Sequence, residues 1–326
     1  MAKNKKIIFI VVGVVLAIIC ITVFVFLYRF SALQRNAEEE TITVNLGTTE
    51  TELIPKLKEQ GYIRNEWAFA FALERKGGKI EPGGYKISKS MSAWKIAKIL
   101  TSEPYMKWVV IPEGLRKEQI AEILATELDW NEQEKSDWVT KFTAMQFDYI
   151  EGVYFPDTYL IPIDESGLEI AQRFINKFNE KFASYAEKFA AQNIKWTTAL
   201  KIASLIQREA GSKDDMPLIA GIIWNRLLKN IKLDIDATLQ YARGNTGNGW
   251  WAPITIADKK IDSLYNTYLY SGLPPHPISN PGINAIDAVL NSMETECIYY
   301  LHDSNKQIHC AKTYTEHKAN IEKYLK

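Results

Sequence analysis

The feature that most constrains this chain is an uncharged apolar run from Ile7 to Tyr28. An α-helix rises about 1.5 Å per residue, so one helix of this length can cross the hydrocarbon layer of a bilayer. A cleaved signal peptide has a shorter apolar region that ends at small residues, whereas this run ends at Tyr28-Arg29-Phe30. We therefore predict a retained transmembrane signal anchor over residues 7–29.

The charges that flank this run predict its orientation. Three lysines precede it within residues 1–6, whereas Arg29 and Arg35 are soon followed by glutamates at 38–40. Because cytoplasmic flanks carry an excess of lysine and arginine, we expect residues 1–6 to be cytoplasmic. The remainder, joined by a polar linker over residues 30–40, is then expected on the periplasmic or extracytoplasmic side of the cell inner membrane.

Composition and charge limit the classes of protein that the rest of the chain can form. The chain has 326 residues and 47% hydrophobic content, enough for two soluble domains with their own cores. Lysine plus arginine equals aspartate plus glutamate at 39 each, and no basic block occurs beyond the N-terminus. A nucleic-acid-binding protein is therefore not expected.

The cysteines and histidines do not indicate a disulfide framework or a metal site. Cys20 lies within the apolar run, while Cys297 and Cys310 fall on two predicted strands of one hairpin, and their pairing stays open. All four histidines lie late in the chain without the spacing of metal ligands. We expect neither a metal nor another cofactor.

Residues 41–108 predict a small module of short helices on a small sheet. An alternating strand begins at Thr41, a helix is expected over Asn65–Lys76, and Gly83-Gly84 makes a turn before a further strand. Pro55 lies inside the first helical stretch, where proline is unfavourable. The module has no grouping of catalytic residues, so we interpret it as a binding, spacing or structural domain.

Residues 109–326 predict a second, mainly helical domain, and the chain as a whole is predicted to be α+β. Apolar periodicity and capping signals indicate helices over 117–128, 131–142, 168–193, 196–210, 216–229, 285–291 and from Thr315 to Leu325. A β-hairpin is expected from residues 297–302 and 307–311.

The helix predicted over Trp196–Gly211 carries the main catalytic candidate, Glu209. This residue follows Leu205 by four positions and Ile206 by three, which places it on their apolar face. We expect Gly211 to end the helix, so that burial and the helix dipole both favour a protonated carboxyl group at Glu209. Such a group suits a general acid, although a glutamate that reaches water at a helix end fits the same stretch.

A second candidate region is the aromatic loop Glu151–Tyr159, which fits neither a helix nor a strand pattern. Aromatic side chains between a glycine and a proline suit either a surface on which sugars stack or a packed loop core. On the first interpretation, Tyr154 and Asp157 are assigned to substrate binding.

Several motifs, taken in order, resemble the YceG-like endolytic murein transglycosylases. They are Ile111–Gly114, Glu151–Tyr159, Ala203–Gly211, Pro217–Leu227, Asp236–Thr238, Tyr265–Tyr268, Gly272–Pro275, Asn280–Gly282 and Tyr314–His317. The resemblance covers about Thr41 to the C-terminus and includes the apolar anchor. It implies a lysozyme-like catalytic domain over 109–326, with Glu209 as the sole acid and base, and a LysM-like module over 41–108.

One position departs from the family pattern. Members commonly have a glutamate two residues before the catalytic one, and this chain has Gln207 there. Because Gln207 is expected to face away from Glu209 on the helix, we expect the chemistry to survive this change.

The resemblance implies cleavage of the bond between MurNAc and GlcNAc in nascent peptidoglycan, which leaves 1,6-anhydro-MurNAc ends and helps to terminate strand elongation. Ordinary glycosidases need two carboxyl groups, whereas this reaction needs one because the 6-hydroxyl of the sugar serves as nucleophile. The residues expected to position the glycan are Asn225, Asp236, Thr238, Tyr265 and Asn266.

Other interpretations stay open. Asp236 could instead cap a turn, or act as the base of a muramidase-type hydrolase together with Glu209. The chain could also be a non-catalytic membrane scaffold. The expected partners are peptidoglycan glycan strands, the inner membrane and, in the scaffold case above all, peptidoglycan synthases.

Overall fold

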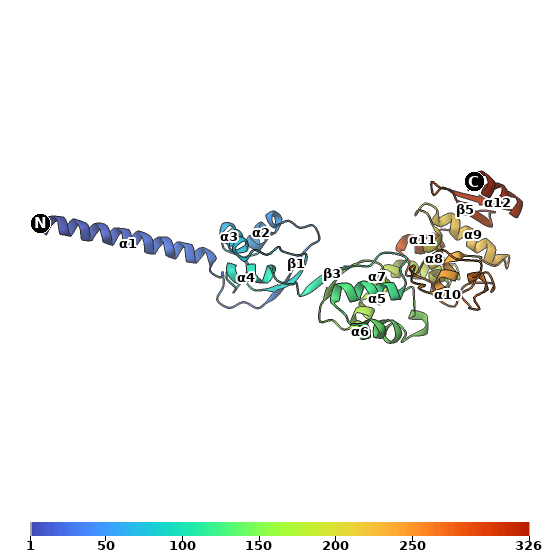
Figure 1. Ribbon diagram of the computed structural model, residues 1–326, viewed down its shortest axis with the longest axis horizontal. Helices are drawn as coiled ribbons and strands as arrows, with labels where there is room; N and C mark the ends of the chain where they lie inside the picture. Colours follow the sequence, from blue (N-terminus) through green and yellow to red (C-terminus); the bar gives the residue numbers. More distant parts are fainter. Residues whose placement is uncertain (1, 326) are drawn as a thin grey trace. The chain divides into compact units, whose positions relative to one another are not determined.

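The computed structural model describes residues 2–325 and divides the chain into two compact units. The first comprises the residues up to Trp108 together with Leu160–Asp164, and the second comprises Val109–Tyr159 and the residues from Glu165 onward. Helices make up most of the regular structure and the strands form two small sheets, which confirms the predicted α+β class (Figure 1).

The first unit begins with α1 (Ala2–Phe30), which Figure 1 shows as one uninterrupted helix. Within it, Ile7–Phe30 has a mean hydropathy of 3.4 and is long and apolar enough to span a membrane. Apart from Phe30 at its end, the apolar side chains of this stretch are exposed around the whole helix, with Phe9 at 77% and Phe24 at 69%. A helix that is apolar on every side needs a surrounding apolar phase, which the predicted anchor would find in lipid.

The rest of the first unit comprises three helices, the first two strands of a sheet and part of its other two strands. The helices are α2 (Glu50–Glu59), α3 (Glu66–Lys76) and α4 (Ala93–Leu100), and the sheet has the order β1 (Glu40–Val44), β2 (Gly83–Ile87), β3 (Met106–Val110) and β4 (Thr158–Pro162). β1 and β2 are antiparallel, with Glu40 opposite Ile87. Asn65 caps α3 by accepting from the amide of Ala68. Pro55 is accommodated within α2, which continues to Glu59.

The segment expected to be a linker, residues 30–40, packs against this module. Phe30 is 4% exposed and belongs to the core of the unit. The amide of Gln34 donates to the carbonyl of Lys89, and the hydroxyl of Ser88 donates to the carbonyl of Ala37. These bonds satisfy backbone groups that a free linker would expose to water.

The second unit is a helical domain built around α8. Its helices are α5 (Lys117–Leu128), α6 (Glu132–Asp137), α7 (Gly167–Ala191), α8 (Trp196–Glu209), α9 (Met216–Leu228), α10 (Asp236–Arg243), α11 (Ile283–Leu290) and α12 (Tyr314–Tyr324). α8 packs against α7, α9, α10 and α11. Its apolar face is buried, since Ile202, Leu205 and Ile206 are each 0% exposed. Burial of this face positions the end of α8, and with it Glu209.

The end of α8 differs from the prediction. Glu209 is the last helical residue, and Ala210 leaves the helix in an extended conformation with a φ of −69°. Gly211 is not among the described residues with positive φ, so the predicted glycine cap is wrong. A Cβ at Gly211 would lie 3.2 Å from Oδ2 of Asp215 and from the ring of His302. Glycine therefore suits this position because it lets these two side chains pack closely against the backbone.

The hairpin near the C-terminus forms as predicted, from β5 (Tyr299–His302) and β6 (Ile308–Ala311). A disulfide joins Cys297 to Cys310, which answers the question that the sequence leaves open. The cap of α12 was predicted at Thr315 and lies at Thr313, whose hydroxyl accepts from the amide of Glu316 while that carboxylate accepts from the amide of Thr313. This capping box explains why α12 begins two residues earlier than predicted.

Candidate active site

Glu209 lies at a polar cavity of the second unit with a volume of about 710 Å³, within the range of ligand pockets. Several elements supply its walls: the end of α8, α9, the segment before α10, the loop after it, the β5 strand and α12. The lining residues are Glu209, Arg226, Leu233, Asp234, Asp236, Lys259, Tyr268, Tyr299, Tyr300, Tyr314 and His317.

The carboxyl group of Glu209 is held by Tyr300. The hydroxyl of Tyr300 donates to Oε2 of Glu209 at 2.6 Å. Burial raises the pKa of Glu209, and the nearby charge of Asp236 raises it further, while the Tyr300 hydrogen bond, His302 and Arg208 oppose this shift. The result is a carboxyl group with a raised pKa at the wall of a cavity, as a general acid requires.

Asp236 is the other predicted site residue that reaches the cavity. It is the first residue of α10 and is exposed. Its Oδ1 accepts a hydrogen bond of 2.5 Å from the hydroxyl of Tyr268. Burial and this bond to Asp236 raise the pKa of Tyr268, so the phenol stays a donor and fixes the carboxylate.

Asn225 and Arg226, at the end of α9, hold the hairpin that carries Tyr300. The Asn225 amide donates to the carbonyls of Thr295 at 2.6 Å and Cys297 at 3.0 Å. The guanidinium of Arg226 donates to the carbonyl of Ile298 at 2.6 Å. Asn225, predicted to bind substrate, therefore makes framework contacts, and Arg226 lines the cavity in its vicinity.

Thr238 and Asn266 are fully buried and are not part of the cavity lining. The hydroxyl of Thr238 donates to the carbonyl of Ile235 at 2.6 Å. The Asn266 side chain donates to the carbonyls of Lys259 at 3.1 Å and Ile261 at 2.8 Å. The Thr238 hydroxyl also lies 2.9 Å from the hydroxyl of Thr267, so both residues hold the loop from which Lys259 and Tyr268 reach the cavity and shape the site without lining it.

Tyr154, Asp157 and Tyr265 also lie outside the cavity lining. Tyr154 is 1% exposed and its hydroxyl donates to the carbonyls of Thr143 and Tyr149, as in the packed-loop interpretation. Asp157 accepts from the amide of Thr158, the next residue, at 2.8 Å. The ring of Tyr265 packs on Tyr241, with centroids 4.7 Å apart.

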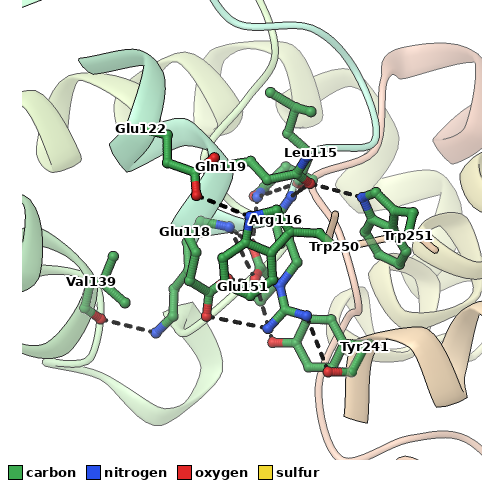
Figure 2. A network of polar contacts seen from close by, with 12 residues as sticks. Leu115, Arg116, Glu118, Gln119, Glu122, Val139, Glu151, Tyr241, Trp250 and Trp251 are labelled. Carbon is green, nitrogen blue, oxygen red and sulfur yellow. Dashed lines mark hydrogen bonds and ion pairs between the residues drawn. The ribbon is translucent and has the colours of Figure 1, made fainter. Parts of the chain in front are cut away.

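A buried carboxyl group elsewhere in the unit, Glu151, forms a separate polar network (Figure 2). Glu151 is 0% exposed and accepts from the amide of Lys117 at 3.1 Å and from the side chain of Asn280 at 2.5 Å. Burial, and then the charge of Glu118, raise its pKa to about 8 against the opposing effects of Lys117 and Arg116. Glu151 does not line the Glu209 cavity, and its hydrogen bonds join the start of α5, the segment before α11 and Tyr241 of α10.

Arg116 connects this network to the tryptophan loop, residues 244–252. Its guanidinium pairs with Glu118 at 2.8 Å and lies over the rings of Tyr241 at 4.1 Å and Trp250 at 4.5 Å, as Figure 2 shows. The indole of Trp251 donates to Gln119 at 2.8 Å, and its ring faces the guanidinium of Arg208 at 3.9 Å. The tryptophan loop is thus held in place by contacts with Arg116, Gln119 and Arg208.

The residues that sequence reasoning missed are Tyr300, Tyr268, Lys259 and the pair His302–Asp215. Nε2 of His302 lies 3.3 Å from Oδ2 of Asp215, close to the end of α8. The alternation of β5 indicates which of its residues share a face, but it does not show which helix that face meets. Contacts between residues so distant in sequence have no local signal.

The fold and the site define an α+β protein whose helical unit places the half-buried carboxyl group of Glu209 at a tyrosine-lined cavity. Comparison with known proteins identifies its relatives. The model of the YceG-like family matches residues 42–323. The chain is 30% identical to the endolytic murein transglycosylase of Bacillus subtilis, over 92% of this chain and 90% of that protein.

Two further relatives support this assignment. The endolytic murein transglycosylase of Streptococcus pneumoniae is 25% identical, over 87% of this chain and 58% of that longer protein. The crystal structure of a YceG-like protein from Listeria monocytogenes matches with a TM-score of 0.61 and 26% identity, over 87% of this chain and 99% of that one. The chain belongs to the YceG-like family.

Proposed function

We propose that this protein is a lytic transglycosylase that cleaves peptidoglycan strands internally, between MurNAc and GlcNAc. The observation that carries the proposal is the position of Glu209, a half-buried carboxyl group at the wall of the cavity with a raised pKa. The names of the relatives from Bacillus subtilis and Streptococcus pneumoniae support the same activity.

The reaction needs one acid and base. Glu209, protonated at first, gives its proton to the glycosidic oxygen as the bond to C1 of MurNAc breaks. The 6-hydroxyl of the same sugar then bonds to C1 and transfers its proton to the Glu209 carboxylate. The products are a 1,6-anhydro-MurNAc end and a GlcNAc end with a free hydroxyl, and no water is consumed.

Tyr300 keeps the carboxyl group in place for both proton transfers. Its hydroxyl occupies Oε2, while Oε1 of Glu209 accepts no hydrogen bond among the described residues. The free oxygen can therefore carry the proton toward the cavity. Asp236 and Lys259, which also line the cavity, are assigned to glycan binding together with the tyrosines there.

The domain assignments follow from this function. Residues 1–6 are assigned to the cytoplasm, 7–29 to the membrane, 41–108 to a LysM-like module and 109–326 to the catalytic domain. The apolar helix α1 supports a single-pass anchor. The lysines within residues 1–6 favour the orientation with the catalytic domain outside the cytoplasm. Cleavage near the membrane would terminate the elongation of nascent strands, with synthases as neighbours.

One observation favours a second candidate, a muramidase-type hydrolase. Asp236 lines the same cavity as Glu209 and raises its pKa by charge, so a base is available there. The Tyr268 hydroxyl, however, occupies one oxygen of this carboxylate. A hydrolase would activate water and leave reducing ends.

Digestion of isolated glycan strands by the full chain in detergent separates these functions. Mass spectrometry should find 1,6-anhydro ends with the wild type and with Asp236→Asn, and none with Glu209→Gln. Reducing ends without anhydro-sugars would show the hydrolase. An intact strand population with folded wild-type protein would support the scaffold instead.

A further inference from the structure

An aromatic cluster joins the end of the apolar helix α1 to α3 within the first unit. The Phe30 ring stacks on Trp94 at 5.3 Å, with an interplanar angle of 13°. The Phe26 ring lies 6.4 Å from Trp67, and Trp67 stacks on Phe71 at 5.6 Å. The last turn of α1 and the first turns of α3 are therefore packed together.

Arg64 fixes the same junction through polar contacts. Its guanidinium lies over the Tyr28 ring at 4.5 Å and donates to the Tyr28 hydroxyl at 3.0 Å. It also donates to the carbonyl of Ala32 at 2.8 Å and to the hydroxyl of Ser31 at 3.1 Å. One planar guanidinium group, with donors on all three of its nitrogens, thus secures the chain as it leaves α1.

One side of α3 stays uncovered next to this junction. Trp67 is 53% exposed, whereas Phe69 on the core side of the helix is 0% exposed. Phe71 and Arg75 follow Trp67 at intervals of four residues, so the three side chains share one face. The guanidinium of Arg75 lies over the Phe71 ring at 5.1 Å. We call these three residues the α3 aromatic face.

The position of Phe26 sets the depth of this face. Phe26 belongs to the stretch Ile7–Phe30 that can span a membrane. It precedes the end of α1 by one helical turn, or about 6 Å along the axis. The polar headgroup layer on each side of a bilayer is about as thick, roughly 5–8 Å. As a helix, Ile7–Phe30 is about 36 Å long, which exceeds the roughly 30 Å hydrocarbon core, so its end extends into the headgroup layer if α1 spans the bilayer. Trp67, whose ring lies beside Phe26, is then near the boundary between that layer and the hydrocarbon core.

We propose that the α3 aromatic face rests in the lipid headgroup layer, so that the first unit is seated on the membrane surface. The chemistry fits this occupant because tryptophan concentrates at the membrane interface and arginine can reach lipid phosphates. The face is continuous with the membrane span through Phe26 and Trp67. This inference rests on the membrane anchoring proposed above.

The test places a fluorescent label on the face in the full chain. With Cys20→Ser as background, Trp67→Cys and Leu46→Cys are each labelled with an environment-sensitive dye and reconstituted into vesicles of phosphatidylglycerol and phosphatidylethanolamine. Leu46 is the matched control, since it is 55% exposed and lies in the same unit on the segment between β1 and α2. A spin-labelled lipid and a water-soluble quencher are then compared at each site.

The label at position 67 should be quenched several-fold more strongly by the spin-labelled lipid than the label at position 46. Equal quenching by the aqueous agent alone at both sites would overturn the proposal. Protein that stays out of the vesicles after alkaline washing would instead refute the anchor on which the inference rests, so the two failures are distinguishable.

A label-free measurement guards against loss of folding in the cysteine variant. Wild type and Trp67→Phe are reconstituted in brominated lipid, which quenches nearby tryptophans. The chain has nine tryptophans, and the fraction that is quenched should fall in Trp67→Phe. An unchanged fraction, with both proteins folded and inserted, would contradict the placement of Trp67 in the headgroup layer.

Discussion

The hydroxyl of Tyr300, on β5, donates to Oε2 of Glu209, the last residue of α8, at 2.6 Å. This bond opposes the effect of burial, because it favours the carboxylate while burial favours the protonated form. The pKa of Glu209 is therefore set mainly by two opposing effects: burial, which raises it, and the hydrogen bond from Tyr300 on the hairpin, which lowers it. In the proposed reaction Glu209 must both give and take a proton, which such a balance suits.

Replacement of Tyr300 by phenylalanine tests this balance. The loss of a donor to the carboxylate should raise the pKa of Glu209 further. A general acid works while protonated, so the alkaline limb of the kcat/KM profile should move to higher pH. We expect kcat at the optimum to fall about 10-fold, since a hydrogen bond to a charged group contributes about 1.5–3 kcal/mol.

The matched control is Tyr314→Phe, which removes a hydroxyl from the same cavity without touching Glu209. Its pH profile should match that of the wild type. If both variants lose activity without any shift of the alkaline limb, Tyr300 has only a structural role.

Glu209→Gln should remove most of the activity while it leaves the fold intact. A glutamine has a similar shape and can still accept from Tyr300, but it has no proton to transfer to the glycosidic oxygen. The expected loss in kcat is about 10²- to 10⁴-fold. Release of anhydro-muropeptides from glycan strands, followed by chromatography, measures it.

Gln207→Glu is the control for this substitution. It places a carboxyl group two residues away and restores the residue that family members commonly have. Oε1 of Gln207 accepts from the amide of Gly282 at 3.0 Å, a bond that glutamate can also make. Near wild-type activity is expected, and a comparable loss in both variants would argue against a specific role for Glu209.

Most of the helices and the position of Glu209 could be predicted because their signals are local, whereas α10 was not predicted and the helix expected over 131–142 continues beyond Asp137 as a π-helix. The apolar stripe of α8 alone places Glu209 against buried residues, and the structure has it as the last residue of that helix. The glycine cap failed because Gly211 serves a close contact with Asp215 and His302 rather than a left-handed turn. Both uses favour glycine, and sequence does not distinguish them.

The rest of the site could not be predicted because it depends on contacts across the fold. Tyr300 is 91 positions from Glu209 and meets it only through the packing of the hairpin on α9. The sequence predicts that Asn225, Thr238 and Asn266 bind glycan. In the structure, their side-chain amides and hydroxyl donate hydrogen bonds to backbone carbonyls instead. A motif shows that a residue is needed, not whether it touches substrate or holds the loop that does.

The raised pKa of Glu151 should make the stability of the protein depend on pH. The pKa of Glu151 is about 8 in the folded protein, against 4.5 as its ordinary value. Between these values the folded state holds a proton that the unfolded state has lost, so the free energy of unfolding should fall as pH rises through this window. Glu151→Gln should flatten that slope in thermal unfolding of the full chain.

Glu122→Gln is the control for this measurement, because it keeps an acceptor oxygen for Trp250 and leaves the Glu151 carboxyl group in place. Its slope should equal that of the wild type. A slope that persists in Glu151→Gln would mean that another group titrates in this range.

The disulfide between Cys297 and Cys310 should matter for activity as well as for stability. The two cysteines are 13 positions apart in the sequence and β5 lies between them, so the disulfide restrains the strand that carries Tyr300. Replacement of both cysteines by serine should lower the free energy of unfolding by about 2–4 kcal/mol. It should also lower kcat, because a less restrained β5 holds Glu209 less well.

Cys20→Ser, which changes the free cysteine on α1, should leave both quantities unchanged. Full activity in the double variant at a temperature where it is folded would show that the packing of Arg226 and Asn225 suffices to hold the hairpin.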